Sequence, residues 1–384
     1  MTRIRRTVLA ASAAVALVCA TGTAAGAAAT APGAVAFPVP ANVSPAASSG
    51  PSSRLCPPAA VAVGFSDGLD KVSFDGVTVG GLSGITPDRR GGGYVAVEDH
   101  SNNDPARLFF LRDPAHPRVT GMLVLRHPDG TPYDANGFDG EGIAVLPDGR
   151  FLISSENEPS IRVFGRDGTQ AAQLDVPKRF AVAPAGEASA NATLEGLSIS
   201  PSGRYVYAAM EGTLSGDVPA GGGEGRFRRI LVYTADRAAP GGFRLVRQIG
   251  YQVDAGNRIA EVAAYDDGRS VVLEAAFTAD VGNTVTLYAV TGADRAPDVS
   301  GVANLSAAPA GDIVAKKQVA DLVRCPTLGA TAKEPQRNPL LDNYEGLAIA
   351  APAGHGPASL LLISDDNFNP TQITRLLRLT AVLP

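Results

Sequence analysis

The chain has 384 residues, of which 45% are hydrophobic and 18% charged. This apolar share supplies material for a core and excludes wholesale disorder. With 33 basic and 38 acidic residues, the formal net charge is −5. An acidic chain without a basic block is a poor candidate for nucleic-acid binding and is better suited to holding cations.

Residues 1–27 have the three-part layout of a secretory signal peptide. Three arginines precede an apolar run over residues 8–20, and residues 25–27 form an A-x-A cleavage site. The apolar run is shorter than the roughly 20 residues that a membrane span needs. The alternatives are an uncleaved anchor and lipidation at Cys19. We expect a secreted, extracellular protein with no membrane attachment after cleavage.

Residues 28–53 contain mainly Ala, Pro, Ser and Gly, a composition typical of a flexible leader. We therefore expect residues 54–384 to form a single domain. Export leaves two cysteines, Cys56 and Cys325. Outside the cytoplasm an even pair favours a disulfide, with two unpaired buried thiols as the alternative.

One pattern recurs along the domain: an apolar run, a turn and a second apolar run that ends in an acidic residue. Each repeat is typical of a β-hairpin. The repeats begin at Ser83, Glu141, Glu195, Glu261 and Glu345. A third strand is predicted after most hairpins, over residues 107–111, 161–164, 229–233, 284–290 and 372–379. A fourth is predicted over residues 119–125, 170–176, 243–251 and 313–322.

Four strands per repeat predict an all-β protein, a β-propeller with four-stranded blades. The spacing of the repeats counts five blades, with six as the alternative if a degenerate blade escapes the pattern. Cys56 lies at the start of the first repeat and Cys325 just before the last. In a closed ring these repeats are neighbours, so the disulfide would fasten the seam.

In four of the five hairpins, acidic residues occupy matching positions on the two strands, and in the first hairpin a serine faces an acid. Positions summed about each turn centre predict five directly opposed pairs, namely Ser83–Glu98, Glu141–Glu156, Glu195–Glu211, Glu261–Glu274 and Glu345–Asp365. Opposed like charges destabilise a sheet. The first strand of each blade lines the propeller channel, so about nine carboxylates are expected to converge on one rim.

Such a rim is tolerable if protons are shared or if a hard cation binds. Ca²⁺ takes six to eight oxygen ligands, and Asn157 and Asn367 would add neutral oxygens. Since His and Cys do not repeat alongside the acids, zinc and copper are disfavoured. The predicted metal ligands are Glu98, Glu141, Glu156, Glu195, Glu211, Glu261, Glu274, Glu345 and Asp365. The alternative is a ring of solvated acids, or a repeat retained for strand register.

The repeated motifs resemble the phytase-like domain of proteins named "esterase-like activity of phytase". The matching motifs are Gly81-Leu82-Ser83-Gly84, Asp139-Gly140-Glu141-Gly142, Ser155-Glu156-Asn157, Leu194-Glu195-Gly196-Leu197, Asn343-Tyr344-Glu345-Gly346-Leu347 and Ser364-Asp365-Asp366-Asn367. The resemblance covers roughly residues 75–380 and implies a secreted propeller that hydrolyses phosphate esters or other esters.

We interpret the chain as a metal-dependent phosphate-ester hydrolase, monomeric and acting on a small molecule. Glu141, Glu195 and Glu211 are the candidate catalytic acids, and His100 and Arg107 are candidate substrate contacts. Two alternatives stay open. One is a metal-dependent lactonase or carboxylesterase, which suits a chain with only five lysines. The other is a non-catalytic propeller that binds a ligand or a partner.

Overall fold

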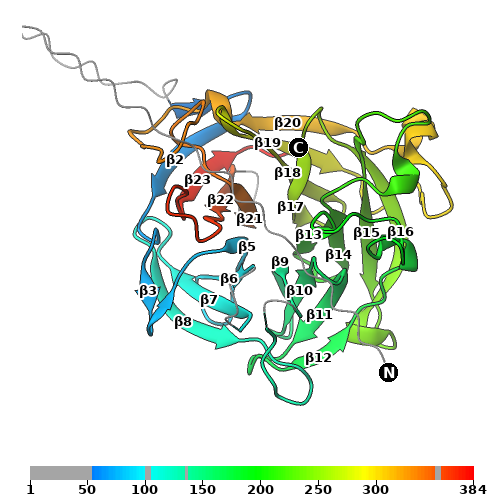
Figure 1. The fold of residues 1–384 in the computed structure, drawn as a ribbon, viewed down its shortest axis with the longest axis horizontal. Helices are drawn as coiled ribbons and strands as arrows, with labels where there is room; N and C mark the ends of the chain where they lie inside the picture. Colours follow the sequence, from blue (N-terminus) through cyan, green and yellow to red (C-terminus); the bar gives the residue numbers. More distant parts are fainter. Residues whose placement is uncertain (1–53, 100–104, 135–136, 351–355) are drawn as a thin grey trace, which may run out of the picture. The chain divides into compact units, whose positions relative to one another are not determined.

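The computed structural model describes residues 54–99, 105–134, 137–350 and 356–384 (Figure 1). Five antiparallel sheets are arranged around a central axis as the blades of a propeller. The helices of the described residues are 3₁₀ turns of three residues each, and none of them has the length and apolar character to cross a membrane. The all-β class and the count of five blades are confirmed. The predicted signal peptide and leader lie outside the described residues.

Four blades are each built from four strands that follow one another in the chain. Blade 1 contains β5 (Leu82–Pro87), β6 (Tyr94–Glu98), β7 (Arg107–Arg112) and β8 (Arg118–Val124). Blade 2 contains β9 (Gly140–Val145), β10 (Phe151–Ser155), β11 (Ser160–Phe164) and β12 (Gln170–Gln173). Blade 3 contains β13 (Leu194–Ile199), β14 (Tyr205–Met210), β15 (Phe227–Ala235) and β16 (Phe243–Gln252). Blade 4 contains β17 (Arg258–Asp266), β18 (Arg269–Thr278), β19 (Gly282–Thr291) and β20 (Lys316–Asp321).

Blade 5 combines the two ends of the domain. Its inner strands are β21 (Tyr344–Ala350), β22 (Ala358–Ser364) and β23 (Leu376–Ala381). The next strand is β2 (Ala60–Ser66), which pairs antiparallel with β23, and β1 (Leu55–Cys56) lies outside it. A short hairpin of β3 (Ser73–Phe74) and β4 (Val77–Thr78) precedes blade 1. Hydrogen bonds between β2 and β23 therefore close the ring.

The core is divided among the five interfaces between neighbouring blades. Each interface holds its own cluster of buried apolar side chains. Between blades 1 and 2, for example, Val95 and Leu108 pack with Ile143 and Phe151. Because both faces of a blade are covered, strands such as β10 are buried along their whole length. The inner strands β5, β9, β13, β17 and β21 contact one another in ring order and surround the axis.

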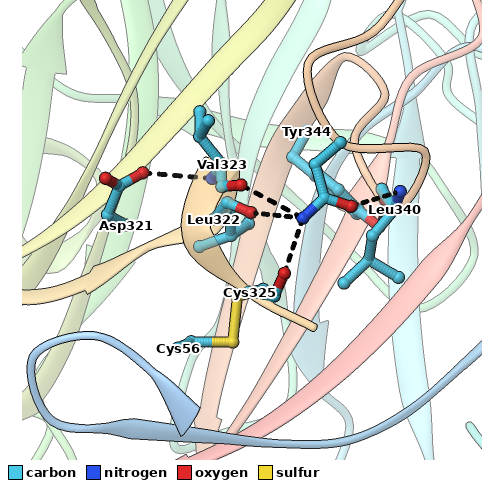
Figure 2. Close-up of a disulfide and its surroundings, with 8 residues drawn as sticks. Cys56, Asp321, Leu322, Val323, Cys325, Leu340 and Tyr344 are labelled. Atoms are coloured by element: carbon cyan, nitrogen blue, oxygen red, sulfur yellow. Dashed lines mark hydrogen bonds between the residues drawn. A yellow bond between two sulfur atoms is a disulfide. The ribbon is translucent and has the colours of Figure 1, made fainter. Parts of the chain in front are cut away.

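The predicted disulfide is present, but Cys56 lies in a different blade from the one expected. Cys56 belongs to β1 on the outer side of blade 5, not to the first blade. Cys325 follows the last strand of blade 4, after the turn η7 (Leu322–Arg324). The bridge therefore joins blades 4 and 5 across 269 positions of sequence (Figure 2). The expectation failed because the chain enters blade 5 before it builds blade 1.

Polar contacts hold the segment around the bridge. The side-chain amide of Asn338 donates to the carbonyl oxygens of Leu322, Val323 and Cys325 at 3.3, 3.2 and 2.8 Å. The Asp321 carboxylate accepts the N–H of Val323 at 3.0 Å (Figure 2). These contacts fix the position of Cys325 beside β1.

We expect the paired substitution Cys56→Ser and Cys325→Ser to lower the free energy of unfolding by about 2–5 kcal/mol, because the bridge restricts a long loop of the unfolded chain. Chemical denaturation of the oxidised wild type and of the double variant measures the difference. The reduced wild type should match the variant. An unchanged midpoint would show that the β2–β23 pairing alone closes the ring.

Candidate metal centre

The inner hairpin of every blade carries a β-bulge at or next to the first residue of its repeat. The first strand of each hairpin has one residue more than its partner between two paired positions. The predicted direct pairing is wrong by one or two positions: Glu98 faces Leu82, and Glu274 faces Ile259. The bulge accounts for one position. In blades 2 to 5 the pairing on the turn side of the bulge already differs by one position from the predicted register. A bulge breaks the strict alternation of side chains and re-aims the residue that it contains.

The bulged strands begin at a cavity of about 540 Å³ at one end of the channel. The lining is almost entirely acidic and amide. It consists of Asp99, Asp139, Glu141, Glu156, Glu195, Glu211, Glu345, Asp365, Asn157, Asn191, Asn367 and Arg258. The opposite ends of the inner strands line a separate cavity of about 350 Å³, with Ile143, Leu197 and Leu347 among its walls. The channel therefore has one acidic end, and the described lining of the cavity at the other end contains no acidic residue.

Six of the nine predicted ligands line the acidic cavity, and three do not. The six are Glu141, Glu156, Glu195, Glu211, Glu345 and Asp365. Glu98 is fully buried and accepts from Arg107 Nη1 at 3.2 Å. Arg107, a predicted substrate contact, is itself 3% exposed and does not line the cavity. His100 lies outside the described residues.

The other two predicted ligands, Glu261 and Glu274, accept hydrogen bonds from donors outside the cavity lining. Glu261 lies on β17, and its carboxylate accepts the backbone N–H groups of Leu197 and Val262, both at 2.8 Å. This contact ties blade 4 to blade 3. Glu274 accepts the Tyr251 hydroxyl at 2.6 Å and also pairs with the ammonium of Lys316. Blade 4 thus sends neither of its repeated acids into the cavity.

Sequence reasoning missed four residues of the lining. Asp99 directly follows Glu98, and Asp139 stands two positions before Glu141, so both lie within two positions of a predicted ligand. Asn191 stands four positions before Glu195, and only the fourth repeat has an asparagine at the matching place, Asn257 before Glu261. Arg258 carries no such signal, because no other repeat has an arginine at that position.

Arg258 is the first residue of β17 and binds carboxylates from both neighbouring blades. Its Nη1 lies 2.8 Å from Glu195 Oε1 and 3.1 Å from Glu211 Oε1. Its Nη2 pairs with Glu345 and donates to Asn343 Oδ1 at 3.2 Å. A single guanidinium therefore compensates three of the acidic residues.

The carboxylates are close enough to share cations. Three groups of three acids each offer ligand oxygens that lie within 4.8 Å of one another. These groups are Asp139–Glu141–Glu156, Glu141–Glu195–Glu345 and Glu156–Glu195–Glu211. Because Glu141, Glu156 and Glu195 each belong to two groups, the three groups form one continuous acidic surface.

Burial and mutual repulsion oppose ionisation in this cavity. Burial, followed by repulsion from neighbouring carboxylates, raises the pKa of Glu141 and Glu195 well above its usual range. The same two causes raise the pKa of Asp99 and Asp365. Only part of this penalty is offset by hydrogen bonds such as that from Ser83 Oγ to Glu141 at 2.7 Å.

The donor set fits a hard divalent cation. Carboxylate and amide oxygens are the ligands that Ca²⁺ accepts, in numbers of six to eight and with loose geometry. Among the described residues, the buried Oδ1 atom of Asp99 accepts no hydrogen bond. A buried carboxylate oxygen without a partner is costly, and a bound cation would remove that cost.

Comparison with known proteins finds one family. Its model, described as "Phytase-like: Esterase-like activity of phytase", matches residues 77–368. No curated protein matches the chain.

Several solved structures align with the chain at low similarity. Hydrazine synthase of Kuenenia stuttgartiensis aligns at 14% identity over 77% of this chain and 81% of that one, with a TM-score of 0.33. Virginiamycin B lyase of Staphylococcus aureus aligns at 9% identity over 81% and 69%, with a TM-score of 0.33. A luciferin-regenerating enzyme aligns at 13% identity over 79% and 93%, with a TM-score of 0.35.

The raised pKa of Glu156 predicts how the stability of the metal-free protein changes with pH. Burial and repulsion from Glu211 raise this pKa from 4.5 to about 7. Between these values the folded protein binds more protons than the unfolded chain, so stability falls as the pH rises. In the metal-free wild type we expect Glu156 to lower the free energy of unfolding by an amount on the order of 2 kcal/mol between pH 4.5 and pH 7.5. The Glu156→Gln variant should not show this decrease.

Thermal unfolding in chelator at several pH values, for wild type and Glu156→Gln, measures this effect. The amide keeps an oxygen that can accept the N–H of Thr193, a bond of 3.0 Å in the wild type. Parallel pH profiles for the two proteins would contradict the raised pKa.

Proposed function

Because the chain belongs to the phytase-like family, described as esterase-like activity of phytase, we propose that it is a secreted, Ca²⁺-dependent hydrolase of phosphate esters whose active site is the acidic cavity. The observation that carries this proposal is the convergence of eight carboxylates on one cavity of about 540 Å³. Such a density of like charge is unfavourable for folding and suits cation binding.

The proposed cation site uses acids from blades 1 and 2. Asp139, Glu141 and Glu156 offer oxygens within 4.8 Å of one another, and Asp99 adds its unpartnered Oδ1. A bound divalent cation would supply Lewis-acid polarisation of the substrate and a lowered pKa for a bound water. It would also reverse the local field, without which these carboxylates repel an anionic phosphate ester.

Among the candidate catalytic acids, Glu211 is the proposed proton acceptor. Its side chain is 16% exposed, against 5% for Glu195, so it is the more accessible of the two from the cavity. Burial raises the pKa of Glu211 above its usual range. A carboxylate with a raised pKa is a better base near neutral pH than an ordinary one. Glu141 and Glu195 are more deeply buried, and their carboxylates would act as fixed negative charges in the site.

Export and the domain boundaries belong to the same proposal. The proposed signal peptide spans residues 1–27, the leader 28–53 and the propeller 54–384. The Cys56–Cys325 bridge is consistent with an extracellular location, where disulfides persist. We propose a monomer that takes a small-molecule ester.

A second candidate function is a metal-dependent lactonase or carboxylesterase. The observation that favours it is the charge of the lining, where Arg258 is the one cation beside eight carboxylates among the described residues. A neutral ester would meet less repulsion there than a phosphate dianion. A non-catalytic binding propeller uses the same cation site without turnover.

Hydrolysis assays of the mature protein on 4-nitrophenyl phosphate and 4-nitrophenyl acetate, in Ca²⁺ and in chelator, test the proposal. We expect phosphate-ester turnover that chelation abolishes and Ca²⁺ restores. Glu211→Gln should lower turnover by about 10²–10⁴-fold if this carboxylate transfers the proton. The matched control is Glu158→Gln, since that side chain is 72% exposed and does not line the cavity.

Three other results would replace the proposal. Turnover of the acetate ester alone identifies a carboxylesterase. Tight Ca²⁺ binding without turnover of either ester identifies a binding module. Turnover that persists in chelator rejects metal dependence.

A further inference from the structure

Blade 4 departs from the pattern of the other blades at the acidic cavity. Blades 1, 2, 3 and 5 each contribute one or more carboxylates to the described lining, whereas blade 4 contributes Arg258. The two repeated acids of blade 4, Glu261 and Glu274, point to other partners. The ring of acids is therefore interrupted by a cation at one of its five positions.

Arg258 divides the cavity into two chemically different halves. Its ion pairs go to Glu195, Glu211 and Glu345, on the flanking blades 3 and 5. The other half is formed by blades 1 and 2, where Asp139, Glu141 and Glu156 form a ligand group that shares none of these partners. The unpartnered Oδ1 of Asp99 belongs to blade 1 as well. One half thus pairs with the guanidinium of Arg258, and the carboxylates of the other half make no ion pair with it.

We propose that Arg258 is a built-in cation that limits the acidic cavity to one divalent cation, held by Asp99, Asp139, Glu141 and Glu156. This inference rests on the proposed function, which requires the cavity to bind Ca²⁺. A guanidinium stays charged at all physiological pH values, and it is tethered to β17, so it occupies its ligands permanently. A second Ca²⁺ would need the carboxylates of Glu195 and Glu345 as ligands. To bind them it would have to displace the guanidinium, and its two positive charges would then lie close to the positive charge of Arg258.

Without Arg258, two groups of carboxylates in the cavity would be available to a second cation. The group Glu141–Glu195–Glu345 has ligand oxygens within 4.8 Å of one another, and the group Glu156–Glu195–Glu211 is equally compact. Removal of the guanidinium leaves Glu195, Glu211 and Glu345 without their ion pair to Arg258. A hard cation is the species that such a set of oxygens binds.

Calorimetric titration of Ca²⁺ into chelator-treated mature protein tests the inference. We expect one site in the wild type and two in Arg258→Met, whose side chain is similar in length but uncharged. Arg258→Lys keeps the charge and should keep one site. The matched control is Arg166→Met, which removes one arginine from a carboxylate pair with Asp88 outside the cavity lining. It should also keep one site.

A second pair of variants tests the assignment without removing Arg258, in case Arg258→Met does not fold. Glu156→Gln should weaken Ca²⁺ binding by about tenfold or more, since it removes a charged ligand of the site. Glu345→Gln should change the Kd for Ca²⁺ by less than about threefold from the wild-type value, because the Glu345 carboxylate pairs with Arg258. Both substitutions reduce repulsion in the metal-free protein.

The outcomes separate the inference from the function on which it rests. Ca²⁺ binding by the wild type with an unchanged or smaller number of sites in Arg258→Met overturns the role of Arg258 alone. Two sites in the wild type, or equal losses for Glu156→Gln and Glu345→Gln, overturn it too. A wild type that binds no Ca²⁺ overturns the proposed function together with the inference.

Discussion

Repulsion among eight carboxylates at one end of the channel is the constraint on which the rest of this structure depends. Burial makes that repulsion stronger, because the interior screens charge less than water does. The protein compensates in three ways: Arg258 pairs with three of the acids, hydroxyl and backbone donors bind others, and the pKa values shift upward. The remaining imbalance is what makes a cation the natural ligand of this cavity.

Such a cavity can persist only in a frame that does not spread apart. The frame consists of five apolar interfaces between blades, closed by the β2–β23 pairing and by the Cys56–Cys325 bridge. Both closures act at blade 5, where the two ends of the domain meet. The burial that stabilises the ring is therefore well separated from the charges that oppose folding, and each set of residues occupies its own region of the blades.

The repeats are alike in backbone and unlike in side-chain chemistry. All five inner hairpins have the same bulge, yet the bulge region holds Ser83 in blade 1, Glu141 in blade 2 and Glu261 in blade 4, with different partners in each case. The fold therefore supplies five similar positions, and the residues at them decide which binds a ligand and which ties strands together. Fold alone does not specify the chemistry of a propeller, so the proposal here rests on the cavity and on family membership.

The sequence by itself determined the strands of blades 1 to 4, the three inner strands of blade 5 and the blade count, because alternating apolar runs and turns are local signals. It also predicted the disulfide, because the predicted cleavage of residues 1–27 leaves two cysteines with a single pairing. The strand β2, which closes the ring, was not predicted. The sequence also identified six of the lining acids by their repetition. Tertiary structure decided the rest. A bulge adds one residue to one strand and leaves no mark in a turn-centred sum, and four of the five sums also missed the register at the turn by one position. The opposed pairs were therefore misplaced. Glu98, Glu261 and Glu274 found donors from other strands, and Arg258 reached the acids of two neighbouring blades. Such contacts depend on which blades are neighbours and on where a side chain points, and the repeated sequence pattern specifies neither.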